Sequence, residues 1–264
     1  MLAAERRKRI MMLLCDQKQV TVAHMRELFQ VSEETIRRDL AKLEKSGILI
    51  RTHGGAILNE LIEETPPVIQ AGDISSQTSN LDWIGEKCAR LVQDGDVVML
   101  DASEVSLHIA KKLKRLKHIT VITNSLKVLI ELHNVESIQL ISTGGKLEPY
   151  TLSYIDFASA KYLSHHYADV SFISCTGIHM EKAVSDSDES AAEMRRIMLH
   201  NAAEKVLAVD QSKFDHYGLT NLTSFSSIDI LITDHRLSPD WINLLDRHQI
   251  SYNDEESSSN YSLI

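Results

Sequence analysis

Short apolar runs alternate with helical segments along residues 83–233, and this alternation is the feature that most constrains the fold. The runs expected as strands cover residues 97–101, 119–123, 138–142, 170–174, 206–209 and 228–233. The expected helices among them cover residues 83–92, 105–116, 126–132 and 191–203. Strands that alternate with helices form a mainly parallel sheet with helices on both faces. The sequence therefore predicts an α/β domain, and 43% hydrophobic residues in a chain of 264 suffice for an ordinary core.

Polar residues and glycines follow four of the predicted strands. Parallel strands end at one edge of a sheet, and ligands bind outside that edge, so these residues are expected to share a pocket. Glycines allow close backbone approach, helix N-termini favour anions and lysine adds a point charge, which suits a hydroxylated anionic metabolite. The predicted effector-binding residues are Asp101, Ser103, Glu104, Ser106, Thr123, Asn124, Ser125, Gly144, Gly145, Lys146, Asp210 and Lys213. Since polar loops cap most strands, each residue alone also has a purely structural interpretation.

Charge is divided unevenly along the chain. Residues 1–57 contain 11 Lys/Arg and 7 Asp/Glu, a net charge of +4. The rest contains 17 Lys/Arg and 30 Asp/Glu, a net charge of −13, so the total of −9 hides a basic segment. A basic head on an acidic body is the pattern expected when only the head meets a phosphate backbone.

The basic segment has the pattern of a helix-turn-helix. Helices are expected over residues 3–17, 22–29 and 33–46, with Thr21 and Ser32 as N-caps and Gly47 closing the third. In the second helix, the residues expected to face inward are Met25, Leu28 and Phe29. In the third, they are Ile36, Leu40 and Leu43, at spacings of four and three.

The opposite face of the third helix carries the candidate DNA-binding side chains. Arg37 and Arg38 lie in its N-terminal half, the part of a recognition helix that reaches base edges. Arginine binds either guanine or phosphate with its planar fork. The predicted DNA-binding residues on or before this helix are Ser32, Glu34, Thr35, Arg37, Arg38 and Lys42. The alternative is an ordinary solvated helix face.

A hairpin is expected after the third helix. Two short apolar runs flank Thr52-His53-Gly54-Gly55, and the glycine pair is expected to supply the positive φ of the turn. This hairpin would be the wing of a winged helix-turn-helix. It would place Arg51 and His53 near the DNA backbone or the minor groove.

These motifs, in this order, resemble the DeoR family of bacterial transcription regulators. The resemblance begins in Ser32-Glu33-Glu34-Thr35-Ile36-Arg37-Arg38-Asp39-Leu40, Leu43-Glu44-Lys45-Ser46-Gly47 and His53-Gly54-Gly55-Ala56. It continues in Leu100-Asp101-Ala102-Ser103, Thr123-Asn124-Ser125, Gly144-Gly145, Thr176-Gly177-Ile178, Asp210 with Ser212-Lys213-Phe214, and Ile232-Thr233-Asp234, and so covers nearly the whole chain.

The resemblance implies a repressor of a sugar-catabolism operon. In that family the larger domain is similar to sugar-phosphate isomerases but acts as a sensor, and its ligand usually weakens operator binding. Ala102-Ser103 and Ser174-Cys175 look most like the fucose and rhamnose branch. The chain departs from the family pattern at Leu81, Glu104-Val105 and Asp156. A carboxylate at Glu104, at the start of a helix that would receive a phosphate, implies either a different ligand or a lost one.

The predicted organisation is a winged helix-turn-helix over residues 1–57, a linker over 58–80, a sensor domain over 81–250 and a disordered tail over 251–264. The chain is expected to be cytosolic, since no stretch approaches the roughly 20 apolar residues needed to span a bilayer. It is also expected to be a homo-oligomer, because two-fold operators match dimeric helix-turn-helix proteins. The rival interpretations are a sugar-phosphate isomerase, with Asp101, Glu104 and Lys213 as catalytic groups, and an architectural DNA-binding protein without a ligand.

No cofactor or metal is expected. The twelve histidines lack ligand spacing, and the three cysteines, Cys15, Cys88 and Cys175, are scattered and interpreted as buried free thiols. An acidic loop with Glu181, Asp186, Asp188 and Glu189 is expected to be solvated.

Overall fold

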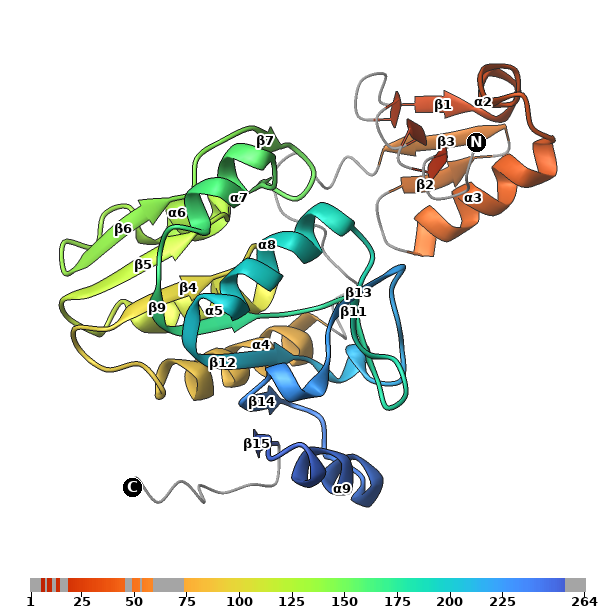
Figure 1. Cartoon of the computed structure of the whole chain (residues 1–264). Coiled ribbons are helices and arrows are strands. Elements are labelled where there is room, and N and C mark those ends of the chain that lie inside the picture. The colour runs from red at the N-terminus through yellow and green to blue at the C-terminus, as the bar shows by residue number, and fades with distance from the viewer. Residues whose placement is uncertain are drawn as a thin grey trace. The chain divides into compact units, whose positions relative to one another are not determined.

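The computed structural model describes residues 6–7, 9–10, 13–14, 19–45, 49–52, 54–58 and 74–254. The chain divides into two compact units, residues 1–76 and residues 77–264 (Figure 1). We call them the recognition unit and the sensor unit and describe each by itself.

The recognition unit is a small α+β domain. Its helices are α2 (Val22–Phe29) and α3 (Glu33–Lys45), and its strands are β1 (Gln19–Thr21), β2 (Leu49–Thr52) and β3 (Gly55–Leu58). The strands form an antiparallel sheet in the order β1-β3-β2, so the predicted β2–β3 hairpin gains a third strand that the sequence analysis missed. Thr21 caps α2 as predicted, since its side chain accepts a hydrogen bond from the backbone N–H of His24.

Most of the predicted inward-facing residues of this unit are buried. Ile36, Leu40 and Leu43 of α3 pack in one cluster with Met25 and with Ile10 from the N-terminal segment. The prediction for Leu28 was wrong, because its side chain is 52% exposed. An eight-residue helix with Val22, Met25 and Phe29 buried has its apolar stripe complete without Leu28. Gly47 lies outside the described residues.

The sensor unit is built on a seven-stranded sheet in the order β15-β14-β12-β9-β4-β5-β6, and every neighbouring pair is parallel. The bounds are β4 (Val97–Leu100), β5 (Ile119–Thr123), β6 (Ile138–Ser142), β9 (Ala168–Ile173), β12 (Ala202–Val209), β14 (Ile230–Thr233) and β15 (Ser251–Asn253). The chain moves outward from β4 through β5 to β6 and then returns to β9 on the other side. The strand order therefore reverses between β4 and β9.

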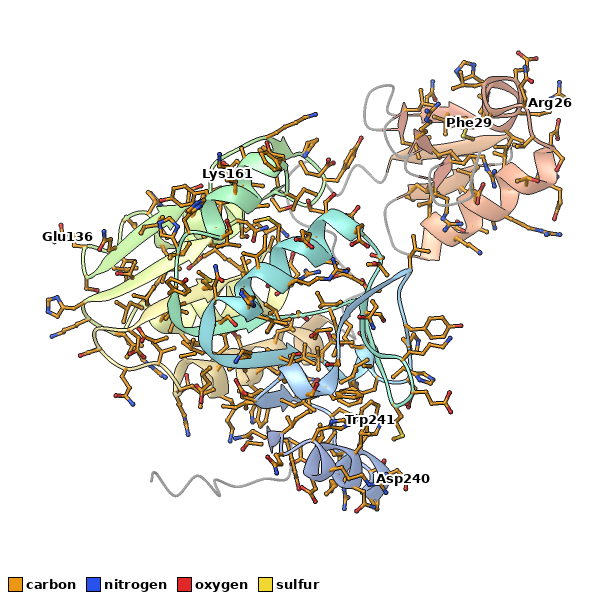
Figure 2. All side chains as sticks on the ribbon, in the orientation of Figure 1. Arg26, Phe29, Glu136, Lys161, Asp240 and Trp241 are labelled. Carbon is orange, nitrogen blue, oxygen red and sulfur yellow. The ribbon has the colours of Figure 1, made fainter. Side chains whose placement is uncertain are left out.

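Helices cover both faces of this sheet, as predicted for an α/β fold. On one face are α4 (Ile74–Ala89), α5 (Glu104–Leu113) and α6 (Leu126–Leu132); on the other are α7 (Phe157–Leu163), α8 (Glu189–His200) and α9 (Pro239–Arg247). The alternation of side chains along a strand divides the core accordingly. Val98 and Leu100 of β4 pack with the first group of helices, and Met99 packs with the second. On α9, Trp241 contacts Phe214 and Phe225 edge-on and is buried (Figure 2).

Short strands beyond the main sheet were not predicted. The small sheet contains β10 (Gly177–His179), β11 (Ala183–Asp186) and β13 (Thr220–Thr223), and a two-stranded hairpin contains β7 (Leu147–Glu148) and β8 (Ser153–Tyr154). Short 3-10 helices, η2 (Gln211–Lys213) and η3 (Phe225–Ser227), follow β12 and β13. Helices α7 and α9 were missed as well.

Two predicted boundaries need correction. Helix α4 begins at Ile74, inside the segment predicted as a linker. The predicted disordered tail begins with an ordered strand, since Ser251–Asn253 is β15 and pairs with β14. Its hydrogen bonds complete the edge of the sheet. Among the described residues, no helix is long and apolar enough to cross a membrane.

Candidate functional site

The exposed face of α3 presents the predicted DNA-binding residues. Arg37, Arg38 and Lys42 are exposed, opposite the buried face formed by Ile36, Leu40 and Leu43. Glu34 is exposed and Thr35 half-buried. Ser32 caps the helix, since its Oγ accepts from the backbone N–H of Thr35 at 3.2 Å, so its role at the helix start is structural. The amphipathic pattern therefore places the cations as predicted.

Arg37 and Arg38 each form an ion pair with the glutamate one turn earlier on the helix. Arg37 Nη2 lies 3.4 Å from Glu33 and Arg38 Nε lies 3.5 Å from Glu34. All four side chains are largely exposed, and such surface pairs contribute about 0.3–0.5 kcal/mol. A contact this weak is readily exchanged for a phosphate or a base edge.

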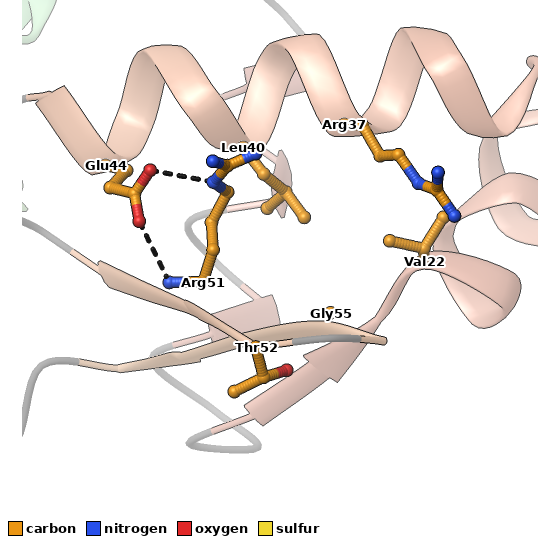
Figure 3. Close-up of a pocket in the computed structure, with 7 residues that line it drawn as sticks. All are labelled: Val22, Arg37, Leu40, Glu44, Arg51, Thr52 and Gly55. Atoms are coloured by element: carbon orange, nitrogen blue, oxygen red, sulfur yellow. Dashed lines mark hydrogen bonds and ion pairs between the residues drawn. The ribbon is translucent and has the colours of Figure 1, made fainter.

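The wing is joined to α3 by a stronger pair. Arg51 of β2 donates from Nε to Glu44 Oε2 at 2.7 Å and from its backbone N–H to Glu44 Oε1 at 3.3 Å (Figure 3). The hydrogen bond from the Arg51 side chain keeps the pKa of Glu44 below its usual value. His53, the other predicted wing contact, lies outside the described residues.

Gly55 of the wing is needed for space rather than for backbone angle. It does not adopt a positive φ, so the expected reason was wrong for this residue. Gly55 lies in β3, the central strand of the sheet of the recognition unit, and a Cβ there would stand 1.9 Å from the carbonyl oxygen of Val20. Gly54 faces open space.

In the sensor unit, the predicted effector-binding residues gather at one edge of the main sheet because all seven strands are parallel. The end of β4 is bonded to the end of β9, since Ser174 N donates to Asp101 Oδ2 at 3.0 Å. The end of β5 is bonded to the end of β6, since Thr143 N donates to Thr123 O at 3.1 Å. The ends of β4, β5, β6 and β9 therefore lie together around the point where the strand order reverses, which is the usual ligand position in such sheets.

Asp101 is a buried structural centre rather than an exposed contact. Its Oδ1 accepts from Ser103 Oγ at 2.5 Å and from Ser106 Oγ at 2.6 Å, and its Oδ2 accepts from Arg195 Nε at 2.6 Å. Burial alone would raise the pKa of Asp101, but the charge of Arg195 and the hydroxyl and backbone donors lower it overall. Asp101 and Ser106 are each 1% exposed, so both organise the loop from within.

Arg195 of α8 is the central residue of this edge that sequence reasoning missed. Its side chain is 14% exposed and also forms an ion pair with Asp186. Asp186 is therefore buried and paired, against the expectation of a solvated acidic loop. Arg195 gives no signal in the sequence, because Asp101 lies 94 residues away and the pairing with Asp186, nine residues away, depends on the fold of β11.

The three residues after β5 divide their tasks. Thr123 Oγ1 donates to the carbonyl oxygen of Leu100 at 2.8 Å, and Ser125 caps α6. Asn124 Nδ2 donates to the carbonyl oxygen of Tyr154 at 3.1 Å. Its Oδ1 is buried and has no hydrogen-bond partner within the described part of the chain. An unsatisfied buried acceptor is costly. A ligand hydroxyl that donates a hydrogen bond to Asn124 Oδ1 would remove this cost.

The glycine loop after β6 is fixed by α7. Gly144 and Gly145 have φ values of 62° and 98°, conformations that suit glycine. Asp156, one departure from the family pattern, caps α7 and accepts from the backbone N–H of Lys146 at 3.1 Å. Hydrogen bonds from the Ser159 side chain and backbone, and from Lys146, lower the pKa of Asp156. Lys146 is exposed.

Glu104 begins α5 and is exposed, and Lys127 of α6 forms an ion pair with it. Sequence reasoning did not find Lys127. Asp210 and Lys213 follow β12 and lie 3.9 Å apart at their charged atoms. Lys213 also acts electrostatically on Cys175, as do Arg195 and Asp101, which places these groups in one neighbourhood.

The cysteines in the described residues, Cys88 and Cys175, are buried free thiols. Burial raises the pKa of Cys175 to about 12, so it is a thiol at neutral pH. The described residues contain no group of three or more His, Cys, Asp or Glu side chains that could hold a metal ion.

Both units of the chain match domains of a known protein family. Residues 6–61 match the DeoR-like helix-turn-helix domain, and residues 76–235 match the DeoR C-terminal sensor domain. The HTH-type transcriptional regulator YulB of Bacillus subtilis (strain 168) is 34% identical over 95% of this chain and 96% of its own. The L-fucose operon activator of Escherichia coli (strain K12) is 31% identical over 88% of this chain and 96% of its own. The lactose phosphotransferase system repressor of Lactococcus lactis subsp. lactis is 30% identical over 83% of this chain and 86% of its own.

Among solved structures, ribose 5-phosphate isomerase A from Methanocaldococcus jannaschii is similar at 17% identity over 52% of this chain and 55% of that chain, with a TM-score of 0.39. The α/β assignment rests on the strand order and register given above.

A winged helix-turn-helix followed by an α/β unit with a polar carboxyl edge defines a transcription regulator with a sensor domain. The matches to both domains identify it further: the chain belongs to the DeoR family.

Proposed function

We propose that this protein is a cytoplasmic repressor of a carbohydrate-catabolism operon, released from its operator when a sugar phosphate or a related sugar binds the carboxyl edge of the sensor sheet. The observation that carries the proposal is the buried, unsatisfied Asn124 oxygen, which lies at the same sheet edge as the positive-φ glycines Gly144 and Gly145. Relatives named for fucose and lactose systems support the carbohydrate class. A homo-oligomer is proposed because it matches a two-fold operator.

The isomerase alternative requires a positioned carboxylate base beside a lysine. Asp101 is a buried carboxylate of this edge, and its two oxygens are occupied by Ser103, Ser106, Ser174 and Arg195. A carboxylate held in this way is poorly suited to abstract a substrate proton. The arrangement therefore favours sensing over catalysis.

The test uses the full chain with an operator selected from a random duplex library. A panel of sugar phosphates and the matching free sugars is added to the complex, and DNA release and the thermal midpoint are measured. The proposal expects at least one compound to release the DNA and to raise the midpoint, since a ligand that binds only the folded state stabilises it. Loss of substrate in an isomerase assay would favour the enzyme. A panel without any effect would leave the ligand-free architectural protein as the better interpretation.

We expect Arg38 of α3 to contact a base of the operator. Arg38 has the more exposed side chain of the two adjacent arginines, at 77%. Arg38→Ala is expected to weaken binding to the selected operator by about tenfold to a hundredfold, because a bidentate base contact is worth about 1–3 kcal/mol. Binding to random duplex should change little. Anisotropy titrations on both duplexes check this, and equal weakening on both would show that Arg38 meets only phosphate.

The second prediction concerns the charge at the start of α5. Glu104→Gln is expected to strengthen binding of a sugar phosphate by about tenfold, because it removes a carboxylate near the phosphate and frees Lys127. The neighbouring Val105, which also departs from the family pattern, is left unchanged. It is buried, and a threonine hydroxyl at this position would enter the core.

Calorimetry with the same sugar phosphate measures the effect. The matched control is Glu136→Gln, which changes the charge equally in the turn before the amino end of β6 (Figure 2). Equal affinities for wild type and Glu104→Gln would place the ligand phosphate away from α5.

A further inference from the structure

A groove of about 490 Å³ runs between α3 and the wing (Figure 3). The residues that line it are Val22, Arg37, Leu40, Glu44, Arg51, Thr52 and Gly55. One wall is the face of α3 formed by positions 37, 40 and 44, spaced by three and four residues. The other wall is the wing, through Arg51, Thr52 and Gly55. The groove is thus built from both elements that a winged helix-turn-helix brings to DNA.

Arg51 is oriented at one end of this groove. Its Nε and its backbone N–H are both bonded to Glu44, which holds the Nε side of the guanidinium against that carboxylate. The terminal Nη1 and Nη2 atoms have no partner among the residues that the structure describes. Glu44 therefore occupies one edge of the guanidinium and leaves the edge with both terminal nitrogens for another acceptor. Paired N–H groups of this kind match the oxygens of a phosphate.

Arg37 stands at the other end of the same groove, beside Val22 (Figure 3). Within the described part of the chain, Arg37 pairs with Glu33 at 3.4 Å, an exposed pair within α3. Arg38 is the next residue along α3, about 100° around the helix, and does not line the groove. The two neighbouring arginines therefore face different surroundings, Arg37 the gap toward the wing and Arg38 open solvent.

We infer that the groove between α3 and the wing receives one strand of the DNA backbone, with Arg51 and Arg37 as phosphate contacts and Glu44 as the residue that positions Arg51. This inference rests on the DNA-binding function and assigns phosphate contacts and base contacts to different cations. Arg38 and Lys42 remain for base edges. Leu40 and Gly55 shape the floor between the two cations, where a sugar-phosphate chain has apolar sugar surface to bury.

The test measures salt dependence with the full chain. Anisotropy titrations use a random-sequence duplex and the selected operator at several salt concentrations. Arg51→Ala is expected to weaken both duplexes alike and to reduce the slope of log K against log salt by about 0.9, the contribution of one phosphate contact. Arg51→Lys keeps the charge and should retain the slope. A wild-type slope in Arg51→Ala would overturn the inference and leave Arg51 as a structural link only.

A double-mutant cycle tests the part played by Glu44. Glu44→Ala alone is expected to weaken both duplexes by about threefold to tenfold, although it removes a negative charge. In the Arg51→Ala background the same substitution should leave binding unchanged or strengthen it slightly. The matched control is Glu27→Ala on α2, which removes an equal charge from a side chain that is 74% exposed.

Glu27→Ala should behave as Glu44→Ala does without Arg51. If Glu44→Ala strengthens binding in the wild-type background, as a simple charge effect would, Glu44 does not position Arg51. Thermal unfolding of each variant separates loss of the fold from loss of the contact. A wild-type protein that binds neither duplex would overturn the DNA-binding function itself.

Discussion

Replacement of Arg195 by methionine is expected to lower the free energy of unfolding of the sensor unit by about 3–5 kcal/mol. Methionine keeps the length of the side chain and removes its charge. Asp101 and Asp186 would then be two buried carboxylates without their shared cation, at a site where both side chains are almost fully buried. Removal of one partner from a buried ion pair is costly because an uncompensated charge is left behind.

The pH dependence of this variant should be reversed. In the wild type, the pKa of Asp101 is lowered overall although burial opposes this, so Asp101 stabilises the fold above its unfolded pKa of about 4 and less as the pH falls. Without Arg195, burial is opposed only by neutral donors, and the pKa of Asp101 should be raised. Its contribution is then lost as the pH rises through the raised value. The variant should therefore recover stability between about pH 7 and pH 5, where the wild type does not.

Urea unfolding at pH 7 and pH 5 measures both effects. Arg90→Met is a suitable control, because Arg90 is exposed and pairs with Glu86 one turn away, an arrangement worth at most about 1 kcal/mol. Asp186→Asn in the Arg195→Met background should restore part of the lost stability. An unfolding free energy for Arg195→Met within 1 kcal/mol of the Arg90→Met value would show that Asp101 and Asp186 have another source of compensation.

The elements that could be predicted from sequence are those with a strong local pattern. The residue ranges of β5, β6 and α6 agree with the prediction because their apolar runs end at polar residues or caps. The buried face of α3 follows from its spacing alone. The short strands β10, β11 and β13 have no such pattern, since three or four residues show no period, and their pairing is tertiary.

The candidate site divides in the same way. Glycines, hydroxyls and cations at strand and helix ends were found because their positions follow from the local elements. Arg195 and Lys127 were missed because their partners, Asp101 and Glu104, lie 94 and 23 residues away in the sequence. Asp39 likewise lies within the family motif on α3, but its side chain is buried, and its Oδ2 accepts a hydrogen bond from Arg6 Nε at 2.6 Å. This ion pair removes Arg6 from the basic surface that the charge count suggests.

The wing shows how a correct position can be reached for the wrong reason. The glycine pair was expected to allow a positive φ, which Gly55 does not adopt. The structure requires Gly55 because β3 lies between β1 and β2, paired with Thr21 on one side and Thr52 on the other. A Cβ at Gly55 would meet the Val20 carbonyl oxygen at 1.9 Å and Thr21 Cα at 2.8 Å.

Gly55→Ala is therefore expected to reduce operator binding by about a hundredfold or more. The clash is with backbone atoms, which cannot rotate away, so β1 and β3 must separate or β3 must shift. Overpacking of this severity costs about 3 kcal/mol, and a unit this small has little stability in reserve. Separation of the strands also moves Arg51, which β2 and β3 hold beside α3.

Gly54→Ala is the matched control, because it makes the same chemical change one residue earlier and its Cβ would meet no atom within 4 Å. It should bind the operator within about twofold of the wild type. Anisotropy titration measures both variants, and circular dichroism with thermal unfolding of the full chain should show an earlier transition for Gly55→Ala alone. If both alanines bind equally well, the sheet β1-β3-β2 tolerates a side chain at Gly55, and the close approach of β1 and β3 is not what makes that glycine necessary.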